Sequence, residues 1–346
     1  MKILKQVLGI DVAQKELVVS LGRLQEDLTV ELYARKVFPN TSKGFVELVS
    51  WVKKLTDPGV GVRFVMEATG VYHESLAYFL ADQSAEVSIV LPNKISNYFR
   101  TLEIKTITDH TASEAITRFG LERKLTLWKR PNPLLKRLKQ LTRERGQIVE
   151  QRTMAKNQLH AEMAEVGPNE TTVNRINKHI LFLDNQEEEI KDEIALLTKK
   201  DLQVNSSIQL LTSIPGVGLL TAATVLAETN GFELIRNKRQ LTSYAGLDVR
   251  EKQSGTSVNG KPRISKRGNR YLRKAMHLPA LAAIRTDERF KAVFARLVAR
   301  HGIKMKAAVA LQRKLLELMY ILHKTNTRFD KDFLGTQLKK EKQPLQ

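Results

Sequence analysis

The chain of 346 residues contains no cysteine. Disulfide frameworks, thiolate zinc sites and cysteine nucleophiles are therefore excluded. Long apolar runs are missing as well, because no stretch reaches the roughly 18–20 uncharged residues that cross a bilayer. The first residues, Met1–Gln14, lack the apolar core of a secretory signal. We therefore expect a soluble cytoplasmic protein without a membrane partner.

Acidic residues are scarce relative to basic ones. The 57 lysines and arginines outnumber the 37 aspartates and glutamates, which leaves a formal net charge of +20. Nine bases and two acids lie within Leu121–Arg145, and twelve bases and two acids lie within Arg236–Lys274. Either run alone would be an ordinary solvated face. Two of them in a strongly basic chain favour binding to a phosphate backbone, without indicating that bases are read.

Residues 1–128 alternate short β-rich runs with helical ones, as in an α/β domain. Three consecutive strands come first, and helices and strands then alternate to the end of the region. The predicted elements are the strands Gln6–Val12, Leu17–Leu21, Thr29–Val37, Val62–Glu67 and Glu86–Val90, and the helices Thr41–Leu55, Val71–Ala81, Asn93–Leu102 and Asp109–Phe119. The order β-β-β-α-β-α-β-α is that of the ribonuclease-H-like fold.

Residues 129–200 are predicted to be helical throughout. Apolar residues recur every three or four positions from Ile176 to Leu197, with Glu187 as the one acid in this seam, and a looser seam precedes the break at Gly167-Pro168-Asn169. This spacing predicts two long helices that form a coiled-coil hairpin. The seam fits either a hairpin within one monomer or pairing between subunits, and we favour a homo-oligomer.

Residues 201–335 are predicted to be mainly α, followed by a polar tail, 336–346. The turn Ile214-Pro215-Gly216-Val217-Gly218 lies between two apolar helices, as in a helix-hairpin-helix. Backbone N–H groups of Gly216 and Gly218 would form an anion site there, or the glycines simply allow the turn. Arg250–Arg263 is β-like, and Asn259-Gly260 indicates a hairpin turn.

Three acids lie where strands or helices end. Asp11 closes the first predicted strand, Glu67 closes the fourth, and Asp109 opens a helix. Neighbouring strands would bring such carboxylates to one sheet edge, where they could hold Mg²⁺ or Mn²⁺ for phosphoryl transfer. Each acid taken alone is equally an end-of-strand or N-cap residue. Actin-like and sugar-kinase ATPases share this strand order, but Val12-Ala13-Gln14-Lys15 has no phosphate-binding glycine.

The motifs together resemble a known family. In the first half they are Gly9-Ile10-Asp11-Val12-Ala13, Met66-Glu67-Ala68-Thr69-Gly70 and Thr108-Asp109, and in the second half Ile214–Gly218, Tyr244-Ala245-Gly246-Leu247, Gln253-Ser254-Gly255 and Ile264–Asn269. In this order and spacing they resemble the DEDD transposases of the insertion-sequence group numbered one hundred and ten, which are related to the Piv and MooV invertases. The resemblance extends from about Gly9 to His323.

The resemblance implies a RuvC-like first domain and a C-terminal transposase domain with a serine loop. It implies that Asp11, Glu67 and Asp109 bind metal and that Ser254 is the nucleophile that cuts and rejoins donor and target DNA. It also implies a structured bridge RNA as guide, dimers or tetramers, and a site of action on the nucleoid of a prokaryotic cell. The residues expected to contact nucleic acid are Lys252, Lys261, Arg263, Lys266, Arg267 and Arg270, with Gly216 and Gly218.

Two residues depart from the family pattern: Ala112, and Val249, which stands where relatives often have proline and for which we expect little consequence. Ala112 stands where the family has a fourth acid, so we expect a natural or engineered change that impairs catalysis. Two alternatives to a recombinase remain open. The first is a RuvC-type junction nuclease that uses water and does not need Ser254. The second is a nucleic-acid-binding protein without catalytic activity.

Overall fold

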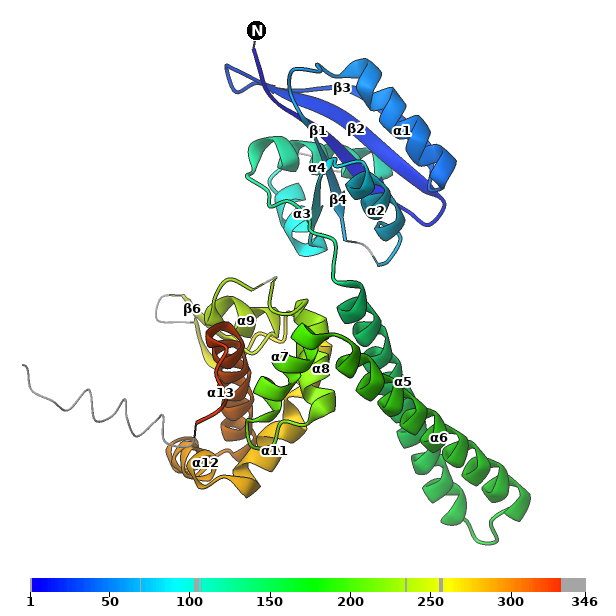
Figure 1. The fold of residues 1–346 in the computed structure, drawn as a ribbon, viewed down its shortest axis with the longest axis vertical. Helices are drawn as coiled ribbons and strands as arrows, with labels where there is room; N and C mark the ends of the chain where they lie inside the picture. Colours follow the sequence, from blue (N-terminus) through cyan, green and yellow to red (C-terminus); the bar gives the residue numbers. More distant parts are fainter. Residues whose placement is uncertain are drawn as a thin grey trace, which may run out of the picture. The chain divides into compact units, whose positions relative to one another are not determined.

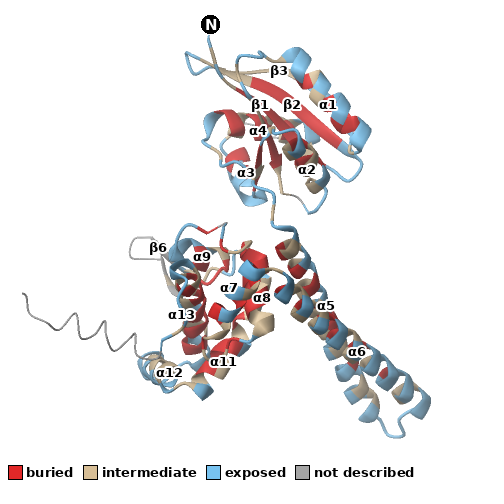
Figure 2. Cartoon of the chain, in the orientation of Figure 1, coloured by how far each residue is buried: buried red, intermediate tan, exposed pale blue. Residues whose placement is uncertain are grey.

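The computed structural model describes residues 2–330 except 69, 103–105, 107, 234 and 255–257. The chain divides into two compact units, Met1–Arg130 and Pro131–Gln346 (Figure 1). Each unit has buried residues of its own, shown in red in Figure 2. The predicted segments 129–200 and 201–335 share one hydrophobic core in the second unit. No helix among the described residues is long and apolar enough to cross a membrane.

A five-stranded mixed sheet, in the order β3-β2-β1-β4-β5, forms the centre of the first unit. Its strands are β1 (Ile3–Val12), β2 (Glu16–Gln25), β3 (Val30–Pro39), β4 (Val62–Glu67) and β5 (Glu86–Val90). The pairs β1–β2 and β2–β3 are antiparallel, whereas the pairs β1–β4 and β4–β5 are parallel. This order is ribonuclease-H-like. β2 is longer than predicted because Arg23 and Gln25 each donate a hydrogen bond of 2.8 Å to Glu31 across the hairpin.

Two helices cover each face of this sheet. The helices α1 (Ser42–Leu55) and α2 (Glu74–Asp82) pack on one face, and α3 (Pro92–Phe99) and α4 (Asp109–Glu122) pack on the other. Side chains alternate along β1, so that Leu8 faces the first pair and Val7 the second. α4 crosses β1 so closely at Gly9 that an added Cβ would lie 2.4 Å from the backbone nitrogen of Thr117.

The second unit begins with two 31-residue helices, α5 (Pro133–Met163) and α6 (Glu170–Lys200). They form an antiparallel pair after a turn in which Gly167 has a φ of +87°, a conformation that favours glycine. Among the described residues, four ion pairs link the helices: Arg137–Glu193, Arg145–Glu187, Arg152–Asp184 and Arg152–Glu187. Glu187, the acid of the apolar seam, is 2% exposed, and the arginines from α5 neutralise its charge.

The rest of the second unit is mainly helical and packs around α8 and α13. Its elements are α7 (Leu202–Thr212), α8 (Leu219–Thr229), α9 (Lys238–Tyr244), β6 (Val249–Ser254), β7 (Val258–Ile264), α10 (Arg270–Ala275), α11 (His277–Thr286), α12 (Glu288–His301) and α13 (Lys304–Thr325). The predicted turn at Asn259-Gly260 is wrong. Asn259 pairs with Gln253 and Gly260 pairs with Lys252 in the β6–β7 hairpin, so both residues lie within β7 and not at a turn.

Candidate active site

Asp11 and Glu67 lie next to each other on parallel strands. Ile10 of β1 is opposite Met66 of β4, so the following residues on the two strands are also adjacent. Burial raises the pKa of the Asp11 carboxyl, and the charge of Asp109 raises it further. Burial likewise raises the pKa of Glu67, with the charge of Asp11 as the second cause. A cation at this edge would lower both pKa values, because it would stabilise the ionised carboxylates.

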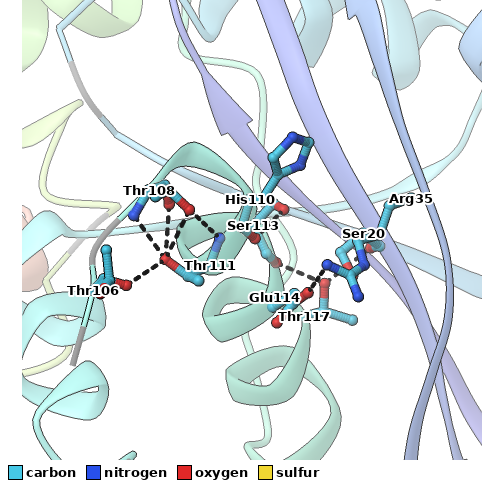
Figure 3. Close-up of polar contacts among 9 residues, drawn as sticks. All are labelled: Ser20, Arg35, Thr106, Thr108, His110, Thr111, Ser113, Glu114 and Thr117. Carbon is cyan, nitrogen blue, oxygen red and sulfur yellow. Dashed lines mark hydrogen bonds and ion pairs between the residues drawn. The ribbon is translucent and has the colours of Figure 1, made fainter. Parts of the chain in front are cut away.

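Asp109 is the first residue of α4, and local hydrogen bonds fix this end of the helix. Thr108 is the N-cap: its hydroxyl accepts from the Thr111 N–H at 3.2 Å, and its N–H donates to the Thr111 hydroxyl at 2.8 Å (Figure 3). The Thr117 hydroxyl donates to the Ser20 carbonyl of β2 at 2.9 Å. Asp109 is therefore not the N-cap, and α4 is attached to the sheet so that this acid lies within electrostatic range of Asp11.

Ala112 lies one turn after Asp109 on the same face of α4. Its methyl group offers no ligand. The next acid on the helix, Glu114, forms an ion pair of 2.7 Å with Arg35 of β3 (Figure 3). Glu114 is thus engaged with the sheet and does not replace the fourth acid that we expect from the resemblance.

The three acids do not converge on a single point. Asp11 interacts electrostatically with both of the others. Among the residues that the structure describes, however, no group of three histidine or acidic side chains is close enough to hold a metal ion. In chemistry the donor set fits a hard divalent cation, because carboxylate oxygens are the ligands that Mg²⁺ takes along with water. Asp11 and Glu67 are the two residues best placed to hold it.

Ser254 is the last residue of β6. The structure gives its backbone pairing with Val258, while its hydroxyl lies outside the described part, as do the side chains of Lys252 and Lys261. The predicted roles of these three side chains stay predictions. The other predicted nucleic-acid contacts in this region, Arg263, Lys266, Arg267 and Arg270, are exposed, as contact with a phosphate backbone requires.

Two motifs of the second unit pack against each other near this hairpin. The Asn269 N–H donates to the Tyr244 carbonyl at 2.7 Å, and the Lys266 N–H donates to the Gly246 carbonyl at 3.1 Å. A Cβ on Gly268 would lie 2.4 Å from the Tyr244 carbonyl oxygen, so this approach requires glycine. The motif Ser265–Asn269 is thereby fixed to the end of α9, and its basic side chains point outward.

A buried ion pair that the sequence analysis missed supports this arrangement. Glu228 of α8 is 1% exposed, and its carboxylate accepts two hydrogen bonds from Arg143 of α5, at 2.7 and 2.9 Å. The Asn269 amide donates to the same carboxylate at 2.7 Å. One signal was present in the sequence, since Glu228 is the single charged residue in the otherwise apolar run of α8.

The first basic run contributes less positive charge than the sequence suggests. Four of its arginines form ion pairs within their own units: Arg130 with Asp82, Arg137 with Glu193, Arg143 with Glu228, and Arg145 with Glu187. These arginines stabilise the fold. The phosphate-binding interpretation of Leu121–Arg145 is therefore too broad.

The two glycines of the α7–α8 turn differ in surroundings. A Cβ on Gly216 would lie 2.6 Å from the Pro279 carbonyl of α11, so this glycine lets the turn pack closely on that helix. Gly218 is exposed and is the N-cap of α8. Its surroundings are open, because no atom of the described residues other than its chain neighbours lies within 4 Å of an added Cβ. Of the two predicted anion-binding positions, Gly218 is the accessible one.

Comparison with known proteins gives matches in both halves of the chain. Residues 8–168 match a transposase family of the IS110 DEDD type, and residues 208–295 match the family described as "Transposase IS116/IS110/IS902 family". The pilin gene-inverting protein of Moraxella lacunata is 27% identical over 332 residues, covering 94% of this chain and 98% of that protein. Its counterpart from Moraxella bovis is 28% identical over 299 residues, covering 85% and 90% respectively.

Among solved structures, Thermus thermophilus RuvC bound to a Holliday junction aligns with 36% of this chain and 99% of RuvC, at 9% identity and a TM-score of 0.28. This identity and TM-score are too low to support an argument about fold or chemistry. The fold assignment therefore rests on the strand order. The ribonuclease-H-like sheet, its edge carboxylates and the two family matches define a DNA transposase or recombinase. The chain belongs to the IS110 family of DEDD transposases, which confirms the family resemblance seen in its motifs.

Proposed function

We propose that this transposase cuts and rejoins DNA with Asp11, Glu67 and Asp109 as metal-binding acids and Ser254 as nucleophile. One observation carries the metal assignment: Asp11 and Glu67 are adjacent, half-buried carboxylates on parallel strands, and the pKa of each is raised. A bound Mg²⁺ or Mn²⁺ would stabilise negative charge on the phosphate and on the departing oxygen. The serine assignment rests on the motif Gln253-Ser254-Gly255 and its place in the family pattern.

In the proposed reaction each phosphoester bond that breaks is replaced by a new one, so no bond is lost to hydrolysis. The Ser254 oxygen forms a bond to phosphorus, the bond to the departing sugar oxygen breaks, the serine proton passes to solvent, and the departing oxygen takes up a proton. A hydroxyl of a second DNA strand then attacks the same phosphorus and releases the serine. The exposed cations Arg263 and Arg267 would stabilise charge that develops on the phosphate.

We further propose that a structured guide RNA specifies donor and target DNA, and that the protein acts as a dimer or tetramer on the prokaryotic nucleoid. Exposed lysines and arginines bind phosphates without regard to sequence. Base pairing with an RNA would supply the missing specificity. The names of the pilin gene-inverting relatives favour a reaction that reconnects DNA over hydrolysis by a junction nuclease.

Trapping of covalent DNA–protein adducts tests the serine assignment. The experiment uses the Ala112→Asp protein with Mn²⁺ and supercoiled DNA that carries the cognate sites. We expect adducts from this protein and from Ser257→Ala, a control at a neighbouring serine, and none from Ser254→Ala or Asp11→Asn. Cleavage without adducts that survives Ser254→Ala would establish a water-using nuclease instead. Complete inactivity of the Ala112→Asp protein on every cognate DNA would favour a non-catalytic binding protein.

A further inference from the structure

A hollow of about 420 Å³ opens in the second unit between α10, α13 and the end of β7. Ile264, which lines the hollow, pairs with Val249 in the β6–β7 hairpin. Ser254 is five residues farther along β6, about 17 Å away for an extended strand. The hollow is therefore a feature separate from the serine.

The floor of the hollow combines apolar side chains with one amide. Ile264 and Val309, both partly buried, supply the apolar surface. Gln312 is 4% exposed, and its amide nitrogen lies 3.0 Å from Nδ1 of His277. A carboxamide carries both a donor and an acceptor, and glutamine uses this pair to bind base edges. Such a floor suits a flat ring with polar edges.

The rim of the hollow is cationic. Lys266, Arg270, Arg273 and Lys274 line it, with Glu150 as the one acid. Arg273 donates to the Ala245 carbonyl at 2.8 Å, and Lys274 pairs with Glu150 at 2.7 Å. Lys266 is exposed and has no ion-pair partner among the residues described.

Two cations lie against the ring of Tyr271 at this rim. The guanidinium carbon of Arg143 lies 4.3 Å from its ring centre, and that of Arg270 lies 4.9 Å from it. The buried Glu228 in turn holds Arg143. The rim therefore offers an oriented aromatic group next to cations that would pair with a phosphate.

We propose that this hollow binds a single unpaired nucleotide, with the base on the apolar floor at Gln312 and the phosphate between Lys266 and Arg270. The inference rests on the proposed function as a nucleic-acid recombinase and deepens it. A paired base cannot enter, because its edge is already occupied by its partner strand. A phosphate alone would not need the apolar floor. The ligand chemistry, an unstacked base with its phosphate, is common to DNA and RNA.

Competition binding with the full-length protein tests the proposal. The probes are a DNA duplex and an RNA duplex that each carry one unpaired nucleotide, with fully paired duplexes of equal length as references. We expect at least one bulged probe to bind about tenfold more tightly than its paired reference, because its base buries apolar surface in the hollow. Val309→Phe fills the hollow without changing charge, and Gln312→Met removes the amide. Both should abolish the preference and leave affinity for paired duplexes unchanged.

Leu278→Phe, at a residue that is 73% exposed and does not line the hollow, is the matched control and should keep the preference. The DNA and RNA probes identify which nucleic acid supplies the nucleotide. Equal affinity for bulged and paired probes would overturn the hollow assignment while leaving the recombinase proposal intact. Failure to bind any duplex would instead overturn the recombinase proposal. If Val309→Phe does not fold, the comparison of bulged and paired probes with Gln312→Met tests the proposal.

Discussion

At position 112 the resemblance to the DEDD transposases leads us to expect an acid, whereas the chain has alanine. Ala112 shares a face of α4 with Asp109, whose charge reaches Asp11. We expect Ala112→Asp to raise Mg²⁺-dependent DNA cleavage by about 10–100-fold, the range typical of groups that support a metal site. Gel assays of nicked plasmid would measure it, with Ala112→Asn as the uncharged control. Equal cleavage by the original and the Asp variant would refute the assignment.

Glu228 gives a second prediction at the residue scale. Replacement by glutamine leaves Arg143 with a weakened partner in a half-buried site. Because the Arg143 side chain is 37% exposed, we expect the free energy of unfolding to fall by roughly 2–3 kcal/mol, which is less than for a fully buried pair. Urea unfolding would measure it. Glu150→Gln, which breaks an exposed pair with Lys274, is the control and should change stability little. Equal losses would contradict the argument.

His323 makes stability depend on pH. Burial lowers the pKa of this histidine, and the charge of Lys324 lowers it further. Its Nδ1 is buried and has no hydrogen-bond partner among the residues that the structure describes. The unfolded chain therefore binds the proton more readily than the folded one. The contribution of neutral His323 to the free energy of unfolding is complete above the ordinary pKa of 6.5. It is lost as the pH falls toward the lower pKa of the folded state.

We expect the unfolding free energy of the protein to fall between about pH 7.5 and pH 5.5 by more than that of His323→Gln. Urea titrations at both pH values measure the difference. The carboxylates titrate in both proteins, so they cancel in the comparison. Parallel pH profiles would show that His323 is solvated.

Helix α4 is the element on which the acidic site depends most. Its close approach to β1 rests on Gly9, because a Cβ there would overlap with Thr117. We expect Gly9→Ala to lower the free energy of unfolding by about 1–3 kcal/mol. It should also shift the NMR signals of residues near Asp109. Gly146→Ala in α5, where nothing lies within 4 Å of the new methyl group, should instead stabilise the protein slightly. A neutral Gly9→Ala change would show that α4 is less tightly packed.

Local patterns predicted most elements of this protein, and non-local contacts account for the errors. The strands β4 and β5 have the predicted bounds because both are short apolar runs with clear breaks. The Asn259-Gly260 turn failed because strand register, which depends on the partner strand, places both residues inside β7. Asp11 and Glu67 could be paired from strand order alone. The Arg143–Glu228 pair could not, since 85 residues separate its members.

At the scale of the whole molecule, the two units have separate cores. The residues of the sheet clusters all lie before position 130, and those of the large helical cluster all lie after it. We therefore expect residues 1–130 and 131–346 to fold when produced separately. Calorimetry should show one cooperative transition for each fragment. A fragment that has native-like circular dichroism only in the presence of the other would contradict this independence.

The ion pairs between α5 and α6 affect the electrostatics of the entire protein. Arginines of α5 lie against acids of α6 at three levels along the pair, so the count of 57 lysines and arginines overstates the number of cations that are free to meet a polyanion. Fewer counterions than this count implies would leave the nucleic acid on binding. The affinity of this transposase for DNA would therefore weaken less steeply with added salt than that of a polycation with the same number of basic residues and no ion pairs.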